Sequence, residues 1–341
     1  MRANLFNSLG NALATLIGFA IVVLVASPVI RWFANATLVA KDGHACHEAG
    51  GACLAFIATW YRFLLFGRYP YAEQWRPALV VAIFVVMIAL STRHRFWGRP
   101  LFGIWGVGVA LVLVLMGGGV AGLPRVDTEL WNGLPLTLML AVGSMFAAFP
   151  LAVMLALGRR SANAAIRAPC VAYIELIRGV PLITILFMAA VMVPILLPAG
   201  FTIDKALRAA MAFAAFGAAY LAEAIRGGLQ AVPHGQYEAS EALGLGYWRR
   251  TALVILPQAL QTAIPALVNT FIGTFKDTSL VVIIGLFDLL STAKIAIEDL
   301  NWQGFYLEAY LFIGLIFFGF CFFMSRFSQS LERRLASGHR A

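Results

Sequence analysis

Long apolar segments dominate this chain and limit what it can fold into. Several of them run for about 20 residues with few charges, the length that an α-helix needs to cross the hydrocarbon core of a bilayer. Of the 341 residues, 61% are apolar and 12% are charged. Since soluble domains carry about 25% charged residues, the sequence predicts an all-α, polytopic membrane protein.

The apolar runs predict about eight transmembrane helices. They cover residues 12–30, 77–90, 101–120, 134–157, 170–197, 206–222, 259–290 and 305–324. The first run outlasts the apolar region of a typical signal peptide, so we expect it to remain as a span. Residues 31–76 are mixed in polarity and predict a soluble or interfacial loop without a core of its own.

The sharpest contrast in polarity is an island at residues 238–257, with strongly apolar sequence on both sides. Apolar residues recur at helical spacing before Gly244, while Glu238 and Glu241 lie on the opposite face. Gly244 stands where a left-handed glycine most often ends a helix. The pattern predicts a short helix, a sharp stop and a second helix, with a new membrane segment at Pro257. A short amphipathic helix between two membrane helices suits docking to another protein. The alternative is an ordinary cytoplasmic loop that happens to be helical.

Charged residues inside apolar runs are costly unless they are paired or hydrated. Glu175 and Arg178 lie three residues apart in the fifth run, and their mutual pairing is favoured over a role in a substrate path. Gly179 and Pro181 beside them predict a bend. Glu223 ends the sixth run and belongs to the same group of structural or path residues.

A second polar interruption lies in the middle of the seventh run. It consists of Lys276, Asp277, Thr278 and Ser279, with Asn269 upstream. A broken helix there would place freed backbone groups and both charges around a hydrated cavity, as in transporter binding sites, and opposite charges suit a zwitterion. The alternative is a charge pair that only stabilises helix packing.

Four cysteines lack any C-x-x-C spacing. Cys46 and Cys53 share the 31–76 segment, where an oxidising compartment allows a disulfide; with His44 and His47 they are also a weaker metal-site candidate. The chain has no G-x-x-x-x-G-K-[ST] motif, no nucleophile elbow and no convergent histidine set. We therefore expect no catalytic residues, no metal, no cofactor and no ATP hydrolysis by this chain.

Basic residues indicate the orientation. With the polar island cytoplasmic, the inward segments hold 14 Lys and Arg residues against four acidic ones, which follows the positive-inside rule. Both termini then face the cytoplasm, and Cys46 and Cys53 face outward. The net charge of +9 thus reports topology and does not imply nucleic-acid binding.

The polar island resembles the EAA loop of ABC importer membrane subunits, whose pattern is EAA-x3-G-x9-I-x-LP. Matching positions are Glu238, Ala239, Gly244, Leu256 and Pro257, with mild departures at Ser240 and Val254. In that family the loop is a coupling helix that sits in a cleft of the ATP-binding subunit. The resemblance implies that the ATPase-coupling residues are Glu238, Ala239, Ser240, Glu241, Ala242 and Gly244.

Further segments are similar to polar amino acid permeases of the ABC importer class. They are 175–182, 220–228, 232–236 and 276–280. The resemblance implies a type I permease core of five helices at 129–335, with the coupling loop at 225–257 and a cytoplasmic tail at 336–341. Residues 1–128, with three spans and a periplasmic loop at 31–76, are similar to the M-type permease of general L-amino acid importers.

Membership of this family implies a transport subunit of a bacterial inner membrane complex. Its expected partners are two ATP-binding subunits, a second permease subunit in a probable heterodimer, and a periplasmic amino acid-binding protein. The substrate would be an L-amino acid. The competing interpretation is a self-contained, ion-coupled secondary transporter or channel that uses Lys276 and Asp277, and it predicts uptake by this chain alone.

Overall fold

The structure, a computed structural model, describes residues 5–96, 98–120, 122–198 and 200–337. Residues 338–341 of the predicted tail lie outside this part. Seven helical stretches are long and apolar enough to cross a membrane, and a bent helix pair supplies an eighth crossing. Within the described residues, the seven are α2 (Leu9–Ala34), the stretch Tyr71–Ser91 with α5 (Trp75–Ser91), α6 (Arg99–Gly117), α7 (Gly133–Arg159), α11 (Lys205–Ala231), the stretch Tyr247–Ile284, and residues Tyr306–Arg333 of α16 (Tyr306–Ser337). The all-α prediction with about eight spans is confirmed.

The bent pair consists of α8 (Ala164–Gly179) and the segment Leu182–Leu196, which meet at 103°. Val180, the residue before Pro181, adopts an extended conformation, because proline disfavours a helical residue directly before it. The second arm contains α9 (Leu182–Phe187), a π-helical turn η4 (Met188–Met192) and α10 (Val193–Leu196). The bend predicted at Gly179 and Pro181 is confirmed.

The chain forms two compact units. One contains residues 1–61 and 293–312, and the other contains residues 62–292 and 313–341. The second unit includes α5 and α6 together with α7 to α14, so the compact units divide the chain at other positions than the predicted boundary between residues 128 and 129.

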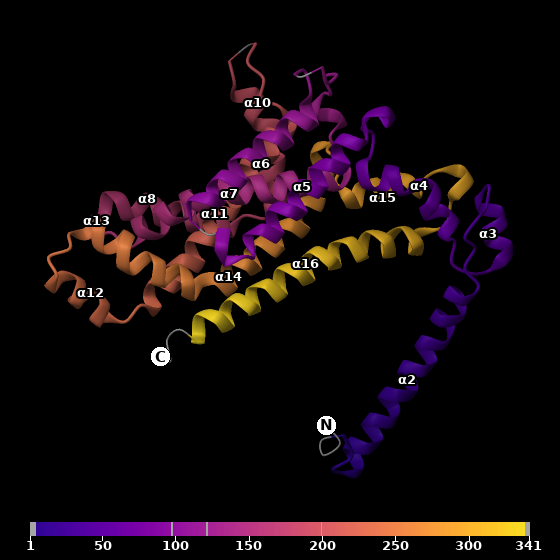
Figure 1. Cartoon of the computed structure of the whole chain (residues 1–341), viewed down its shortest axis with the longest axis horizontal. Coiled ribbons are helices and arrows are strands. Elements are labelled where there is room, and N and C mark those ends of the chain that lie inside the picture. Colours follow the sequence, from indigo (N-terminus) through magenta and orange to yellow (C-terminus); the bar gives the residue numbers. More distant parts are fainter. Residues whose placement is uncertain (1–4, 97, 121, 199, 338–341) are drawn as a thin grey trace. The chain divides into compact units, whose positions relative to one another are not determined.

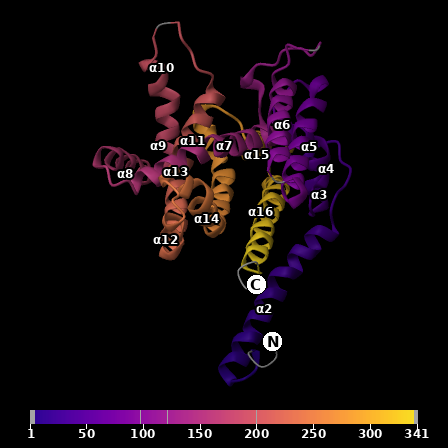
Figure 2. The same cartoon turned by 60° about the vertical axis from the view of Figure 1, so that its left-hand side comes forward.

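In the larger unit, α7, α11 and α14 (Leu256–Asp277) lie side by side (Figures 1 and 2). Small residues let α11 approach both neighbours, as in other tightly packed membrane helices. An added Cβ at Gly228 would lie 2.1 Å from the carbonyl oxygen of Ala259 on α14, and Ala218 and Ala222 are fully buried. The Ala-rich sixth span is therefore the central helix of this unit.

The hairpin of α5 and α6 is fixed at one end by a buried guanidinium. Arg76 is fully buried and donates hydrogen bonds to the carbonyl oxygens of Leu115 at 2.5 Å and Pro124 at 2.9 Å. The helix ends at Gly117, and Gly118 has a φ of +65°. The glycine run at 117–119 thus terminates the third span.

The structure corrects the prediction of a coreless loop at 31–76, of which residues 31–61 belong to the smaller unit. This segment contains α3 (Gly43–Ala49), the apolar helix α4 (Leu54–Phe66) and a short turn η1 (Tyr71–Glu73). Phe56 is fully buried against the rings of Trp302 and Phe305, at 6.0 and 6.1 Å between centroids. The backbone N–H of Cys53 donates to Glu308 at 2.9 Å. Because these partners lie some 250 residues later, local composition does not reveal the core.

A disulfide joins Cys46 and Cys53, whose Cα atoms are 5.5 Å apart. Both cysteines are buried, and His47 next to Cys46 stacks on Phe305 at 4.7 Å between ring centroids. The disulfide therefore closes a small ring that packs within the smaller unit.

The seventh span differs from its prediction in both its start and its break. It begins at Tyr247, ten residues before Pro257, and runs through α13 (Tyr247–Arg250), a π-helical turn η5 (Thr251–Ile255), α14 and a 3-10 helix η6 (Thr278–Ile284). Pro257 lacks an N–H and would collide with the Leu253 carbonyl in a regular helix, and the π turn lies directly before it. The chain leaves the span at Gly285, which has a φ of +77°. Asp288 then accepts hydrogen bonds from the first turn of α15 (Leu289–Ala296).

Candidate functional site: the α12 loop and the exposed face of α14

The predicted coupling loop forms a short helix, α12 (His234–Ala242), between α11 and α13. Gly244 has a φ of +71°. The N–H of Leu245 donates to the Ser240 carbonyl at 3.1 Å, and the N–H of Gly244 donates to the Glu241 carbonyl at 2.8 Å. These two bonds form a Schellman motif, which needs a left-handed residue at this position. The prediction of a helix with a glycine stop is confirmed.

Large apolar side chains on this loop face solvent. Leu243 is 80% exposed and Trp248 is 75% exposed. Glu238, Ala239 and Glu241 are exposed as well. Exposed apolar groups set among charges are typical of a surface that another protein covers. We define the docking surface as Glu238, Ala239, Glu241, Ala242, Leu243 and Trp248.

The hydroxyl of Ser240 is buried and donates to the Gln236 carbonyl at 2.7 Å. The departure from alanine at this EAA position is therefore satisfied inside α12 and adds no unpaired polar group.

Three contacts tie α12 to the membrane helices. Arg160, at the end of α7, donates to the Tyr237 hydroxyl at 3.1 Å and to the Leu229 carbonyl of α11 at 3.0 Å. Gln258 of α14 donates to Gln236 at 3.1 Å. Figure 2 shows α12 beyond the end of α14 and close to α13. These contacts thus connect α12 with α7, α11 and α14.

The third contact is an ion pair between Arg250 of α13 and Glu241 of α12. Sequence reasoning missed this pair, Arg160 and Gln258. In the sequence, Arg160 and Arg250 counted only as basic residues that indicate orientation. The signal that could have revealed their roles is that Tyr237 and Glu241 are polar side chains that need partners.

The predicted path residues divide between two environments. Asn269 and Lys276, seven residues apart, lie on one face of α14 and are exposed. Asp277 is half-buried next to Lys276, and Thr278 is fully buried with its hydroxyl bonded to the Phe275 carbonyl at 2.8 Å. Ser279 is half-buried in η6. The structure thus places Asn269 and Lys276 on the same exposed face, about two turns apart, and Thr278 is buried.

The exposed face of α14 continues as a stripe along the helix. It contains the half-buried Gln258 and the exposed Thr262, Asn269 and Lys276, with the apolar Pro265 between Thr262 and Asn269. Each lies three, four or seven residues from the next. We call it the α14 polar stripe. On the opposite side, Ala259 and Ala263 are buried and face α11. Polar side chains at membrane depth are costly against lipid and line protein interfaces or hydrated paths.

The predicted helix break at 276–278 is not seen in the described residues. The span narrows there from an α-helix to the 3-10 helix η6 and stays ordered up to Gly285. Each threonine hydroxyl of this region, at Thr270, Thr274 and Thr278, donates to a carbonyl of its own helix. Back-bonded threonines satisfy the chain internally, so the interruption does not open the helix.

The Glu175 side chain corrects another expectation. It pairs with Arg159 of α7 at 2.8 Å, and Arg159 also lies 3.4 Å from Glu223 of α11. Glu223 in turn forms an ion pair with Arg226. Arg178 instead lies over the ring of Tyr220, at 5.5 Å from its centroid. Glu175 therefore does not pair with Arg178, as its three-residue spacing suggested. Its partner Arg159 lies on a neighbouring helix, and the ion pairs form a network across α7, α8 and α11.

Within the described ranges, the structure gathers no group of three His, Cys, Asp or Glu residues that could hold a metal ion.

Comparisons with known proteins identify a family of membrane transport components. Residues 148–337 match the family described as "Binding-protein-dependent transport system inner membrane component". The chain is 46% identical to the inner membrane amino-acid ABC transporter permease protein YhdY of Escherichia coli K12, over 99% of this chain and 93% of that protein. It is 36% identical to the glutamate/glutamine/aspartate/asparagine transport system permease protein BztC of Rhodobacter capsulatus, over 100% and 94% of the two chains.

A solved structure gives the same result for the fold. The chain is similar to the crystal structure of an amino acid ABC transporter with histidines, with 34% identity and a TM-score of 0.52. The match covers 59% of this chain and 92% of that one.

Proposed function

Since this chain belongs to the family of binding-protein-dependent transport system inner membrane components, we propose that it forms the translocation path for L-amino acids in an ABC importer. Its own residues supply a membrane path and a docking loop, and the ATPase is a separate subunit. The observation that carries this function is α12, which has a glycine-locked end, an exposed docking surface and ties to α7, α11 and α14. The ion-coupled secondary transporter is not favoured.

Coupling follows from the way in which α12 is held. An ATP-binding subunit that closes on its partner would move the docking surface, and the contacts of Arg160 and Gln258 would carry that movement to α7 and α14. A nucleotide cycle can shift the membrane helices only through contacts that differ between the two states. The residues proposed for this contact are Glu238, Ala239, Ser240, Glu241, Ala242 and Gly244.

The α14 polar stripe supports a path and a second permease subunit. An exposed Lys276 and Asn269 at membrane depth need either water or protein on their outer side. A second permease, in a probable heterodimer, would cover this face and enclose a hydrated path between the two chains. We propose Lys276, Asp277 and Asn269 as path residues, with Ser279 at the edge and Thr278 as their buried support.

The remaining partners and the orientation complete the proposal. Two ATP-binding subunits would dock on the cytoplasmic side, and a periplasmic amino acid-binding protein would deliver substrate on the other. By the positive-inside rule, the basic segments that flank α12 support a cytoplasmic position for this loop and both termini. The location is the bacterial inner membrane.

Purification of the complex in mild detergent from its native host tests the proposal. An ATP-binding subunit and a second permease should co-purify, and the loaded binding protein should stimulate ATP hydrolysis. Glu238→Lys should release the ATPase and abolish uptake without loss of membrane insertion, whereas the control Glu298→Lys, also exposed but distant in sequence from the loop, should retain the ATPase. Uptake driven by an ion gradient in liposomes that hold this chain alone would contradict the proposal.

A further inference from the structure

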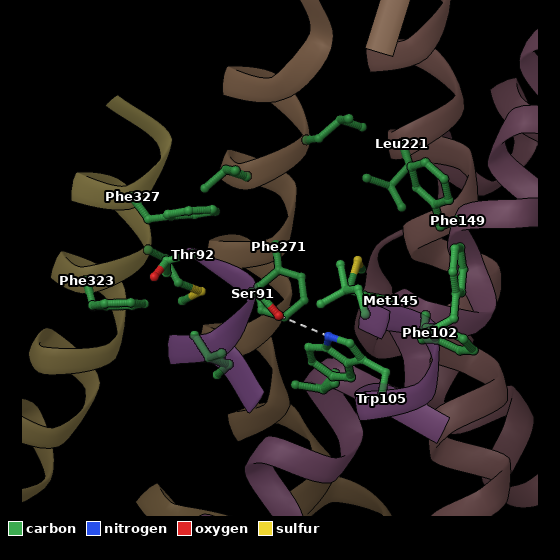
Figure 3. Close-up of a pocket in the computed structure, with 17 residues that line it drawn as sticks. Ser91, Thr92, Phe102, Trp105, Met145, Phe149, Leu221, Phe271, Phe323 and Phe327 are labelled. Carbon is green, nitrogen blue, oxygen red and sulfur yellow. Dashed lines mark hydrogen bonds between the residues drawn. The ribbon is translucent and has the colours of Figure 1, made fainter. Parts of the chain in front are cut away.

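A cavity of about 470 Å³ lies in the larger unit between the α5–α6 hairpin and the helices α7, α11, α14 and α16 (Figure 3). Its wall includes Trp105, Met145, Val268, Phe271 and Phe323. Phe275 of α14 packs on Phe317 and Phe320 of α16 at 5.2 and 5.5 Å between ring centroids. The cavity forms further along both helices, and it is separate from the α14 polar stripe.

The few polar groups of the wall are already bonded within the protein. The indole N–H of Trp105 donates to the Ser91 hydroxyl at 3.0 Å (Figure 3). The Ser91 and Thr92 hydroxyls donate to the carbonyls of Met87 and Ala89, each at 2.7 Å. Water enters a cavity only where several polar partners are open to it, and apolar cavities stay dry. The space is open on one side, where the wall residues Phe102 and Phe146 are exposed. A hydrocarbon chain from the surrounding lipid can therefore enter it and make dispersion contacts with the apolar wall.

The turn from α5 into α6, which lies between the wall residues Thr92 and Leu101, is rich in arginine. Arg93, Arg95 and Arg99 are exposed in or next to this turn, and Arg326 is exposed on α16 beside the wall residue Phe327. With eight crossings this turn lies on the same side of the membrane as α12. Anionic headgroups of the cytoplasmic leaflet attract such basic clusters.

We infer that this cavity holds one acyl chain of an anionic phospholipid from the cytoplasmic leaflet, with its headgroup on Arg93, Arg95 and Arg99. The hydrocarbon fills the space between the hairpin and the core, and the phosphate neutralises the basic turn. The lipid thereby joins α5 and α6 to α14 and α16, which frame the same space. The choice of leaflet rests on the cytoplasmic orientation proposed above.

Photolabelling of the purified complex in lipid nanodiscs tests this inference. The probe is phosphatidylglycerol with a photoreactive group in one acyl chain, compared with phosphatidylethanolamine that carries the same chain. We expect phosphatidylglycerol to label peptides of α14 and α16 that contain Val268 and Phe323, and to label them several-fold more strongly than phosphatidylethanolamine does. Equal labelling by the two lipids would overturn the anionic headgroup, and the absence of label from the peptides that contain Val268 and Phe323 would overturn the lipid.

Two pairs of variants sharpen the test. Val268→Trp fills the cavity and should abolish labelling, whereas Val107→Trp, on an exposed face of α6, should leave it intact. Gln at Arg93, Arg95 or Arg99 should weaken phosphatidylglycerol retention by about fivefold for each residue, while Arg125→Gln should have no effect. Unchanged labelling of Val268→Trp, in a complex that retains its ATPase, would refute the site, and labelling sites in the unaltered chain decide the matter if that variant does not assemble.

Discussion

Replacement of Gly244 tests whether a backbone turn, and not side-chain volume, holds the docking surface in place. An added Cβ at Gly244 meets no atom within 4 Å, but the residue has a φ of +71°. Gly244→Ala therefore introduces left-handed strain of about 1–2 kcal/mol without a clash inside the chain. The free loop can relax because it is exposed, so the strain reappears on docking. We expect the ATP-binding subunit to bind about 5- to 30-fold more weakly.

Gly244→Asn separates strain from volume. Asparagine is larger than alanine but tolerates the left-handed region better, so we expect it to bind the ATPase more tightly than Gly244→Ala does. Gly246→Ala is the matched control, because Gly246 is equally open but has a φ of −64°. Affinity of the purified ATP-binding subunit for the permease complex in nanodiscs is the measurement. If asparagine binds more weakly than alanine, or if alanine at both positions behaves alike, the strain argument is refuted.

Three further predictions concern the two compact units. Arg76→Ala should lower the free energy of unfolding by about 1–3 kcal/mol for each carbonyl left without a donor, which is measured as a lower Tm in detergent. Arg125→Ala, at an exposed position, should leave the Tm unchanged. Reduction of the Cys46–Cys53 disulfide, or Cys46→Ser, should cost about 2–3 kcal/mol of local stability, read as faster proteolysis within residues 31–61. Burial raises the pKa of Tyr69 to about 12. Its protonated form therefore contributes stability that is fully present below about pH 10 and is lost as the pH rises toward 12. Alkaline unfolding curves of Tyr69→Phe should lack this loss.

Local sterics made some features predictable from sequence. Gly244 and Gly118 have backbone angles that other residues adopt at a cost, and Pro181 excludes a helical Val180, so the loop stop, the end of the third span and the bend could each be placed. The coupling residues proposed on this loop came from its resemblance to the EAA loop and not from local sterics. Apolar run length likewise located the spans, because the bilayer sets one common length for them.

Contacts between distant segments set the limit of that reasoning. Glu175 has a neighbouring arginine three residues away, but its partner is Arg159 on α7. The loop at 31–76 looked coreless because its aromatic partners, Trp302 and Phe305, lie far along the chain. The ties of α12 were missed for the same reason, since Arg160 gains its role only when α7 ends beside Tyr237.

The smaller unit has a consequence for the order of synthesis. Its first part, residues 1–61, leaves the ribosome about 250 residues before Trp302 and Phe305, a delay of roughly 10–50 s at bacterial elongation rates. During that interval Phe56 lacks the aromatic side chains that bury it. Only the short loop between Cys46 and Cys53 can close early, by forming its disulfide. Early oxidation would therefore constrain the conformation of the nascent N-terminal segment until Trp302 and Phe305, on which it packs, have been synthesised.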